Sequence, residues 1–141
     1  MVTQLKSHTR GPDGRYGPTA RDHYYVSVYY HRKNAAQNPN KSRWQIEEGQ
    51  EYEVFRIGDE SGWWCAASSA LFSIIDQGQL SLGDEDQRLA VFPKPQNQTD
   101  SWHGWPTHAS DAKPNPNLLD QWEAAGVVDY AMRIKIDKGR I

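Results

Sequence analysis

Alternation of apolar and polar positions predicts a β-strand early in the chain. From residue 24 to residue 30, Tyr and Val occupy every second position, and the residues between them are mostly polar or tyrosine. A repeat of two is typical of a strand with one face against a core. Residues 1–21 lack this repeat, carry four Lys or Arg residues and contain several Gly and Pro, as flexible segments do. We expect a flexible basic arm over residues 1–21 and a single globular domain over residues 22–141.

Two further hydrophobic patterns predict a β-hairpin and a long helix. Residues 44–46 and 52–57 are largely apolar and flank a polar turn, which indicates a hairpin. From residue 63 to residue 75, apolar residues recur with the spacing i, i+3, i+4, i+7, i+8, i+11 and i+12. This spacing predicts a helix over about residues 62–76.

The second half of the chain predicts three short strands and one short helix. Residues 80–82 and 88–92 indicate two strands, and five prolines make residues 93–117 a long connection. A short helix is predicted over about residues 118–125. The apolar residues from 128 to 136 alternate, which favours a strand, although a helix over the same stretch is the alternative. The predicted fold class is α+β, an antiparallel sheet of five or six strands with the long and the short helix packed on it.

Composition limits the class of protein. The chain has 141 residues and a net charge of -2, which suits one domain. It contains no apolar run of about 20 residues and no apolar export segment near its start, so we expect a soluble, cytoplasmic protein without membrane association. Cys65 is the single cysteine, which excludes an internal disulfide. No motif points to a cofactor.

Charge is unevenly distributed along the chain. Residues 1–43 carry eight Lys or Arg against two Asp, whereas residues 44–86 carry one Arg against ten acidic residues. Such an arrangement can steer a charged partner. The alternative is that the two segments face each other across the fold, as charges on small proteins often do.

The strongest candidate for binding is an aromatic and histidine-containing loop. Trp102, His103 and Trp105 surround Gly104 and precede Pro106, which together favour a rigid presentation of flat rings. Rings of this kind anchor protein interfaces, although tryptophans under a long loop also fill cores. We expect a non-catalytic binding or regulatory module, similar in profile to an immunity or inhibitor protein, that recognises a possibly basic protein partner. Acidic residues would steer this association, namely Glu47, Glu48, Asp59 and Glu60.

A cysteine–histidine thiol hydrolase is the alternative function. Cys65 stands near the start of the predicted helix, where the helix dipole favours a thiolate, and His103 or His108 would act as its base. Over five positions, residues 64–68 resemble the nucleophile segment of papain-like cysteine peptidases, but no glycine–glutamine stretch precedes them at the expected place. Burial of Cys65 as a small packed side chain is the competing interpretation.

Two other groups of residues are weaker candidates. Asp100, His103, His108 and Asp111 have donor atoms suited to a divalent metal, but their spacing matches no standard zinc signature and no metal is favoured. The outer face of the first predicted strand combines aromatic and basic groups, as single-strand nucleic-acid binders do. The ten neighbouring acidic residues make nucleic acid an unlikely partner. The residues expected to face a ligand on this strand are His23, Tyr25, Tyr29 and His31.

Overall fold

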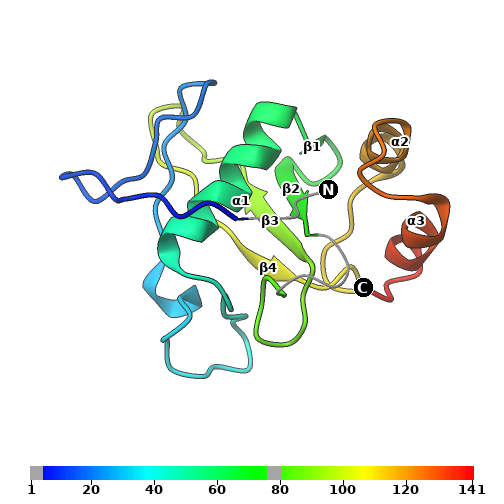
Figure 1. Ribbon diagram of the computed structural model, residues 1–141, viewed down its shortest axis with the longest axis horizontal. Helices are drawn as coiled ribbons and strands as arrows, with labels where there is room; N and C mark the ends of the chain where they lie inside the picture. The colour runs from blue at the N-terminus through cyan, green and yellow to red at the C-terminus, as the bar shows by residue number, and fades with distance from the viewer. Residues whose placement is uncertain (1–4, 76–80) are drawn as a thin grey trace.

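The computed structural model describes residues 5–75 and 81–141, and within them it shows a four-stranded antiparallel sheet with helices on both faces (Figure 1). The strand order is β1-β2-β3-β4, so neighbours in sequence are neighbours in the sheet. In chain order the elements are η1 (Tyr29–His31), α1 (Glu48–Ser61), β1 (Trp64–Cys65), β2 (Ala70–Ile74), β3 (Leu89–Pro93), β4 (Trp105–Thr107), α2 (Pro116–Ala124) and α3 (Tyr130–Asp137).

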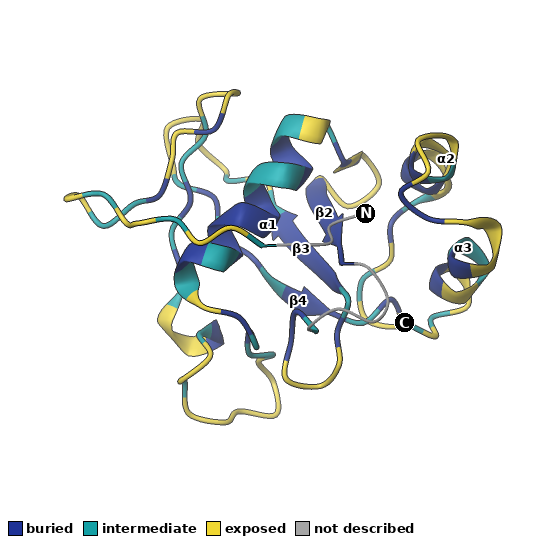
Figure 2. Ribbon diagram, in the orientation of Figure 1, coloured by how far each residue is buried: buried dark blue, intermediate teal, exposed yellow. Residues whose placement is uncertain are grey.

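The central strands β2 and β3 separate two hydrophobic clusters. They pair from Ala70 opposite Pro93 to Ile74 opposite Leu89, and all five residues of β2 are buried. Because side chains alternate along a strand, Phe72 and Ile74 belong to one cluster, whereas Leu71 belongs to the other. Figure 2 shows the sheet as buried and the loops around it as largely exposed.

The first cluster lies between the sheet and the pair α2 and α3. The Asn115 side chain accepts a hydrogen bond from the backbone N–H of Leu118 and caps the start of α2. Asp129 caps α3 in the same way. The helices contribute large apolar side chains to this cluster: Leu118, Leu119, Trp122, Met132 and Ile136.

The second cluster lies between the sheet and α1. A capping box formed by Glu47 and Gln50 begins α1, and Gly62 ends it with a φ of 70°, in the left-handed region that favours glycine. Residues 5–21 lie against the outer side of this helix, and Tyr16 is buried in the second cluster. The backbone of His8 passes so close to Gly49 that a Cβ at residue 49 would collide with the His8 carbonyl oxygen.

The predicted sheet of five or six strands is wrong, because the described residues form four strands. The predicted helix over residues 62–76 is also wrong, since β1 and β2 occupy this stretch. Both faces of β2 are buried, so its apolar residues form a continuous run rather than an alternation. Together with Trp63, Ala66 and Ala67, this run reproduces helical spacing by coincidence.

The predicted hairpin over residues 44–57 is also wrong. Helix α1 occupies most of this stretch, and it is buried on several sides because the sheet covers one side and residues 5–21 another. An amphipathic pattern is therefore absent. The predicted strand at residues 22–31 is replaced by η1 and by bridges from Tyr25 to Tyr16 and to Trp102.

In the second half, β3 and α2 confirm the strand predicted over residues 88–92 and the helix predicted over about residues 118–125. The strand predicted over residues 128–136 is wrong, and the helical alternative is right. Of the strand predicted over residues 80–82, residue 80 lies outside the described residues, and residues 81 and 82 are not in a strand. Among the described residues, no helix has the length and apolar character needed to cross a membrane.

Candidate functional site

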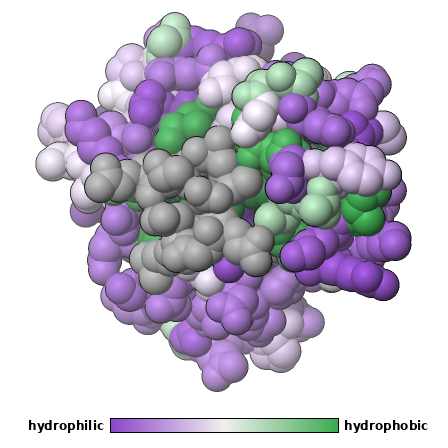
Figure 3. Space-filling model, turned by 45° about the vertical axis from the view of Figure 1, so that its right-hand side comes forward, coloured by the Kyte–Doolittle hydropathy of each residue, from purple (hydrophilic) through white to green (hydrophobic). Residues whose placement is uncertain are grey.

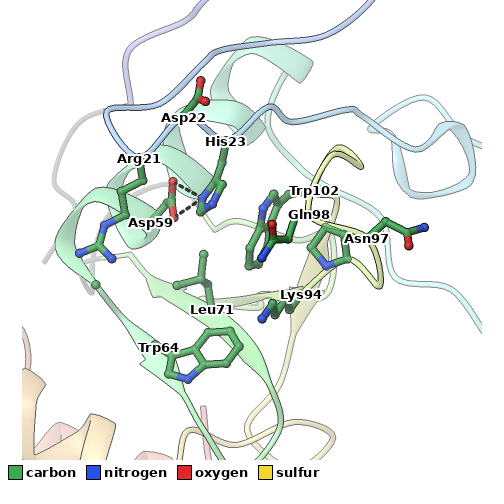
Figure 4. Close-up of a pocket in the computed structure, with 12 residues that line it drawn as sticks. Arg21, Asp22, His23, Asp59, Trp64, Leu71, Lys94, Asn97, Gln98 and Trp102 are labelled. Atoms are coloured by element: carbon green, nitrogen blue, oxygen red, sulfur yellow. Dashed lines mark hydrogen bonds and ion pairs between the residues drawn. The ribbon is translucent and has the colours of Figure 1, made fainter.

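A pocket of about 470 Å³ opens where the end of α1 meets residues 21–23 and the loop after β3 (Figure 4). Strands β1 and β2 contribute Trp64 and Leu71 to its wall, and Trp102 closes another side. Four separate parts of the chain therefore meet at this pocket.

A hydrogen-bonded chain of three side chains lies at one wall of the pocket. Asp59 is almost fully buried and accepts a 2.6 Å hydrogen bond from the Thr19 hydroxyl. His23 Nδ1 lies 2.9 Å and 3.0 Å from the two Asp59 oxygens and donates to them. Nε2 of His23 makes no hydrogen bond within the described part of the chain, so it is available to a ligand as donor or acceptor.

Backbone geometry brings His23 to Asp59. The Thr19 N–H donates to the His23 carbonyl oxygen at 2.9 Å, which closes a tight loop. The Thr19 hydroxyl also accepts hydrogen bonds from the backbone N–H groups of Arg21 and His23, at 3.3 and 3.2 Å. Thr19 thus orders the loop and orients the Asp59 carboxylate at the same time.

Two indole rings form the apolar part of the pocket. Trp102 is 6% exposed, and its ring centroid lies 5.3 Å from that of His23 and 5.6 Å from that of Phe55. Trp64 is 38% exposed. Figure 4 shows Leu71 between the His23–Asp59 pair and Trp64. Trp102 is thus almost fully buried at the pocket, whereas more than a third of Trp64 is exposed there.

Two cations at the pocket have no carboxylate partner within ion-pair distance among the described residues. These are Arg21 and Lys94, both exposed. Asp22 is the exposed anion that lines the same pocket. The side chains that line it include no Ser, Thr or Cys, so the pocket offers no hydroxyl or thiol nucleophile. His23 can still take a proton from water or from a ligand hydroxyl.

A second pocket, of about 590 Å³, gathers other predicted residues. His31, His103, Trp105, His108 and Asp111 all line it. The predicted binding loop is therefore divided: Trp102 faces the first pocket, and His103 and Trp105 face the second.

The remaining predicted ligand-facing and metal-binding residues are not brought into one site. Tyr25 is buried and donates from its hydroxyl to Glu51 at 2.7 Å, whereas Tyr29 is 73% exposed. Asp100 accepts from the Asn97 side chain and lines neither of these two pockets. Among residues 5–75 and 81–141, no group of three or more His, Cys, Asp or Glu side chains could hold a metal ion.

Cys65 is fully buried in the first cluster, and its Sγ accepts a 3.0 Å hydrogen bond from the Ser68 hydroxyl. It lines neither of the two pockets that hold His103 and His23. A buried thiol cannot reach a substrate, so the geometry gives the thiol hydrolase no accessible nucleophile.

The acidic residues predicted to steer a partner face basic residues of this chain. Glu47 lies 3.1 Å from Lys33 Nζ, and Glu60 lies 2.6 Å from Arg56. Glu48 lies 3.7 Å from Arg32, and Asp59 is the partner of His23. Three of these four acids therefore face basic or histidine residues of the N-terminal segment across the fold, and Glu60 pairs within its own helix.

Sequence reasoning missed the pairing that builds the first pocket. His23 and Asp59 are 36 residues apart, and Thr19 and Asp59 are 40 apart. A pattern of neighbouring residues in the sequence cannot predict contacts between residues so far apart. Arg21, Lys94 and Trp64 also went unnoticed, because single residues become a site only when the fold brings them together.

Nothing outside the chain assigns a role to these residues. Comparisons with protein-family models, with curated proteins and with solved structures found no match to this chain.

Proposed function

We propose that the protein binds a small ligand of nucleotide size, with a flat ring and an anionic group, in the pocket beside His23. The observation that carries this proposal is that Arg21 and Lys94, which have no carboxylate partner among residues 5–75 and 81–141, lie at one pocket with an exposed indole. This proposal replaces a protein partner by a small ligand as the leading candidate.

The side chains around the pocket suit the two parts of such a ligand. The exposed indole of Trp64 can stack on a planar ring, as aromatic side chains do with bases. Lys94 and Arg21 can bind a phosphate or carboxylate. His23 Nε2, held in place by Asp59, can form a directional hydrogen bond to the edge of the ring.

The size of the pocket also supports a small ligand. A volume of about 470 Å³ lies inside the range of roughly 300–1,000 Å³ that is common for small-molecule sites. No Ser, Thr or Cys side chain lines the pocket, which favours binding over catalysis through a hydroxyl or thiol nucleophile.

Calorimetric titration with the mononucleotides AMP, GMP, CMP and UMP tests this function. At least one should bind with a dissociation constant in the range of about 10 μM to 1 mM, as expected for a few such contacts. Lys94→Gln removes one cation and should weaken binding at least about fivefold. Lys135→Gln is the matched control, because Lys135 is an exposed lysine on α3, outside the pocket.

The proposal fails if none of the four nucleotides binds at millimolar concentration. It also fails if both lysine variants weaken binding equally, because the effect would then reflect net charge rather than this pocket.

Recognition of a protein partner is the second candidate function. It is favoured by the exposure of Trp64 at the pocket, since exposed aromatic side chains anchor interfaces. Hydrophilic side chains cover most of the described surface in Figure 3, and hydrophobic ones form small separate areas, so such an interface would depend on few anchors. If this candidate is right, the calorimetric titrations with mononucleotides show no binding. The Trp64→Ala variant should then fail to capture a protein partner, whereas the Lys135→Gln variant should still capture it.

A further inference from the structure

The second pocket differs from the first in its chemistry. It lies between η1, the loop over residues 38–42, and β4 with the segment that follows it. Many of its lining side chains are neutral groups with hydrogen-bonding amides or hydroxyls: Asn38, Asn40, Ser42, Gln87 and Thr107. Amide and hydroxyl groups offer donors and acceptors without net charge.

An aromatic stack fixes two imidazoles at this pocket. The ring of His31 lies 5.3 Å from that of Trp105 with an interplanar angle of 16°, and His103 lies 6.3 Å from Trp105 at 29°. His31 Nδ1 donates a 2.6 Å hydrogen bond to the Ser42 carbonyl oxygen. Its Nε2 is therefore the acceptor nitrogen of the neutral ring. The stack gives both imidazoles defined orientations before any ligand arrives.

His103 carries an unmet hydrogen-bonding requirement. Its Nδ1 is buried and has no hydrogen-bond partner within the described part of the chain. A buried polar atom without a partner destabilises the folded state. The His103 side chain as a whole is only partly buried and lines the pocket, so the ring can form a hydrogen bond with a ligand hydroxyl in either tautomer, because a hydroxyl both donates and accepts.

The charges around the pocket disfavour an anion. Burial lowers the pKa of His31 and of His103, so both rings are neutral at pH 7. Lys41 lies over the ring of Tyr30, and its charge is opposed by two carboxylates that line the same pocket, Glu85 and Asp111. His108 also lines the pocket. A neutral ligand fits this balance.

We propose that the pocket around His31, His103 and Trp105 binds a neutral polyhydroxylated ligand, most simply a saccharide. A sugar hydroxyl both donates and accepts hydrogen bonds. The neutral imidazoles, amides and hydroxyls that line this pocket also offer both donors and acceptors, so they can pair with such hydroxyls. The volume of about 590 Å³ accommodates one or two sugar rings. This site is separate from the pocket beside His23 and does not depend on the function proposed there.

The test is an NMR titration of the full chain with maltose, N-acetylglucosamine and methyl α-mannoside, following the indole N–H signal of Trp105. At least one sugar should shift this signal, with a dissociation constant of about 0.1–10 mM. His103→Leu and Asn40→Ala should each weaken binding at least about fivefold. Asn34→Ala is the matched control, since Asn34 is exposed and outside the pocket, and Lys94→Gln should also leave sugar binding unchanged.

The proposal is overturned if none of the three sugars shifts the Trp105 signal at about 50 mM. Equal weakening by Asn34→Ala and Asn40→Ala would overturn it as well. Binding of inorganic phosphate in place of sugar, with loss in Lys41→Gln, would assign the pocket to an anion instead. Asn40 is exposed, so Asn40→Ala should fold and decide the question if His103→Leu does not.

Discussion

The two faces of the sheet are stabilised in different ways. On the side of α2 and α3, apolar side chains fill the cluster, and Trp122 is completely buried among them. On the side of α1, the buried residues include three carboxylates, Glu51, Glu53 and Asp59. The first side depends on removing apolar surface from water. The second also depends on giving each buried acid a partner.

Residues of the N-terminal half supply these partners. Glu51 accepts hydrogen bonds from the hydroxyls of Tyr25 and Ser27, at 2.7 and 3.1 Å. Burial acts to raise the pKa of Glu53, but hydrogen bonds from Arg56 and His8 outweigh it and hold this pKa below its usual value. Both candidate pockets are lined in part by residues between 21 and 42. The polar face is thus also the face that carries the candidate chemistry.

Removal of a large side chain from the apolar face should have the largest effect. Trp122→Ala is expected to lower the free energy of unfolding by about 3–5 kcal/mol, because it leaves a cavity in a fully buried position. Urea unfolding of the variant and of wild type at pH 5 and pH 9 measures this loss of stability. The loss should be the same at both pH values, and a difference above about 1 kcal/mol would contradict a purely apolar face.

The polar face should instead make stability depend on pH. Burial raises the pKa of Glu51 from 4.5 to about 8. Between these values the folded protein holds a proton that the unfolded chain has released, so stability falls as pH rises from 4.5 to 8. The slope for this group is at most about 1.4 kcal/mol per pH unit. The Glu51→Gln variant should show a smaller dependence of the free energy of unfolding on pH. At pH 9 it should be more stable than wild type by about 2 kcal/mol, because the neutral amide replaces a buried charge.

Measurements from pH 7 to pH 8 isolate this effect, because the slope from Glu51 disappears above its folded-state pKa of about 8. Burial lowers the pKa of His31 and His103, so their protonation destabilises the fold only as pH falls below their usual range. Glu123→Gln, on α2 across the sheet, is the control and should keep the wild-type slope. An unchanged slope in Glu51→Gln would show that another group causes it.

An exposed ion pair on the polar face should have the smallest effect. Lys33 pairs with Glu47 at 3.1 Å, and both side chains are at least half exposed. Lys33→Ala should change the free energy of unfolding by no more than about 0.5 kcal/mol, because water and salt screen such pairs. A loss above about 1 kcal/mol in urea unfolding would mean that surface pairs, and not only the buried acids, hold the N-terminal segment in place.

The fold was predictable from the sequence where local signals mark both the type of an element and its ends. Helix α2 has a capping residue and an apolar stripe, and strand β3 is bounded by Pro93. Prediction failed for β2, because both of its faces are buried and no polar alternation remains. It failed for α1, because the buried side of this helix includes the acidic residues Glu51, Glu53 and Asp59. Helix α3 was missed because its alternating apolar residues match a strand more fully than a helix.

The candidate sites were predictable only as lists of residue types. His23, Asp59, His103 and Trp105 all drew attention from the sequence, but their grouping did not. Asp59 was assigned to an acidic surface, whereas it is 2% exposed and holds His23. Residue type indicates what a side chain can do, and only long-range contacts decide which side chains act together.

The position of residues 5–21 against α1 has a practical consequence for protein production. A chain shortened to begin at residue 22 would remove His8 and Thr19, and with them partners of the buried carboxylates of Glu53 and Asp59. It would also uncover Tyr52, whose ring packs against those of His8 and Tyr16. Trimming this end to improve crystals or expression would therefore cut away one layer of the folded molecule.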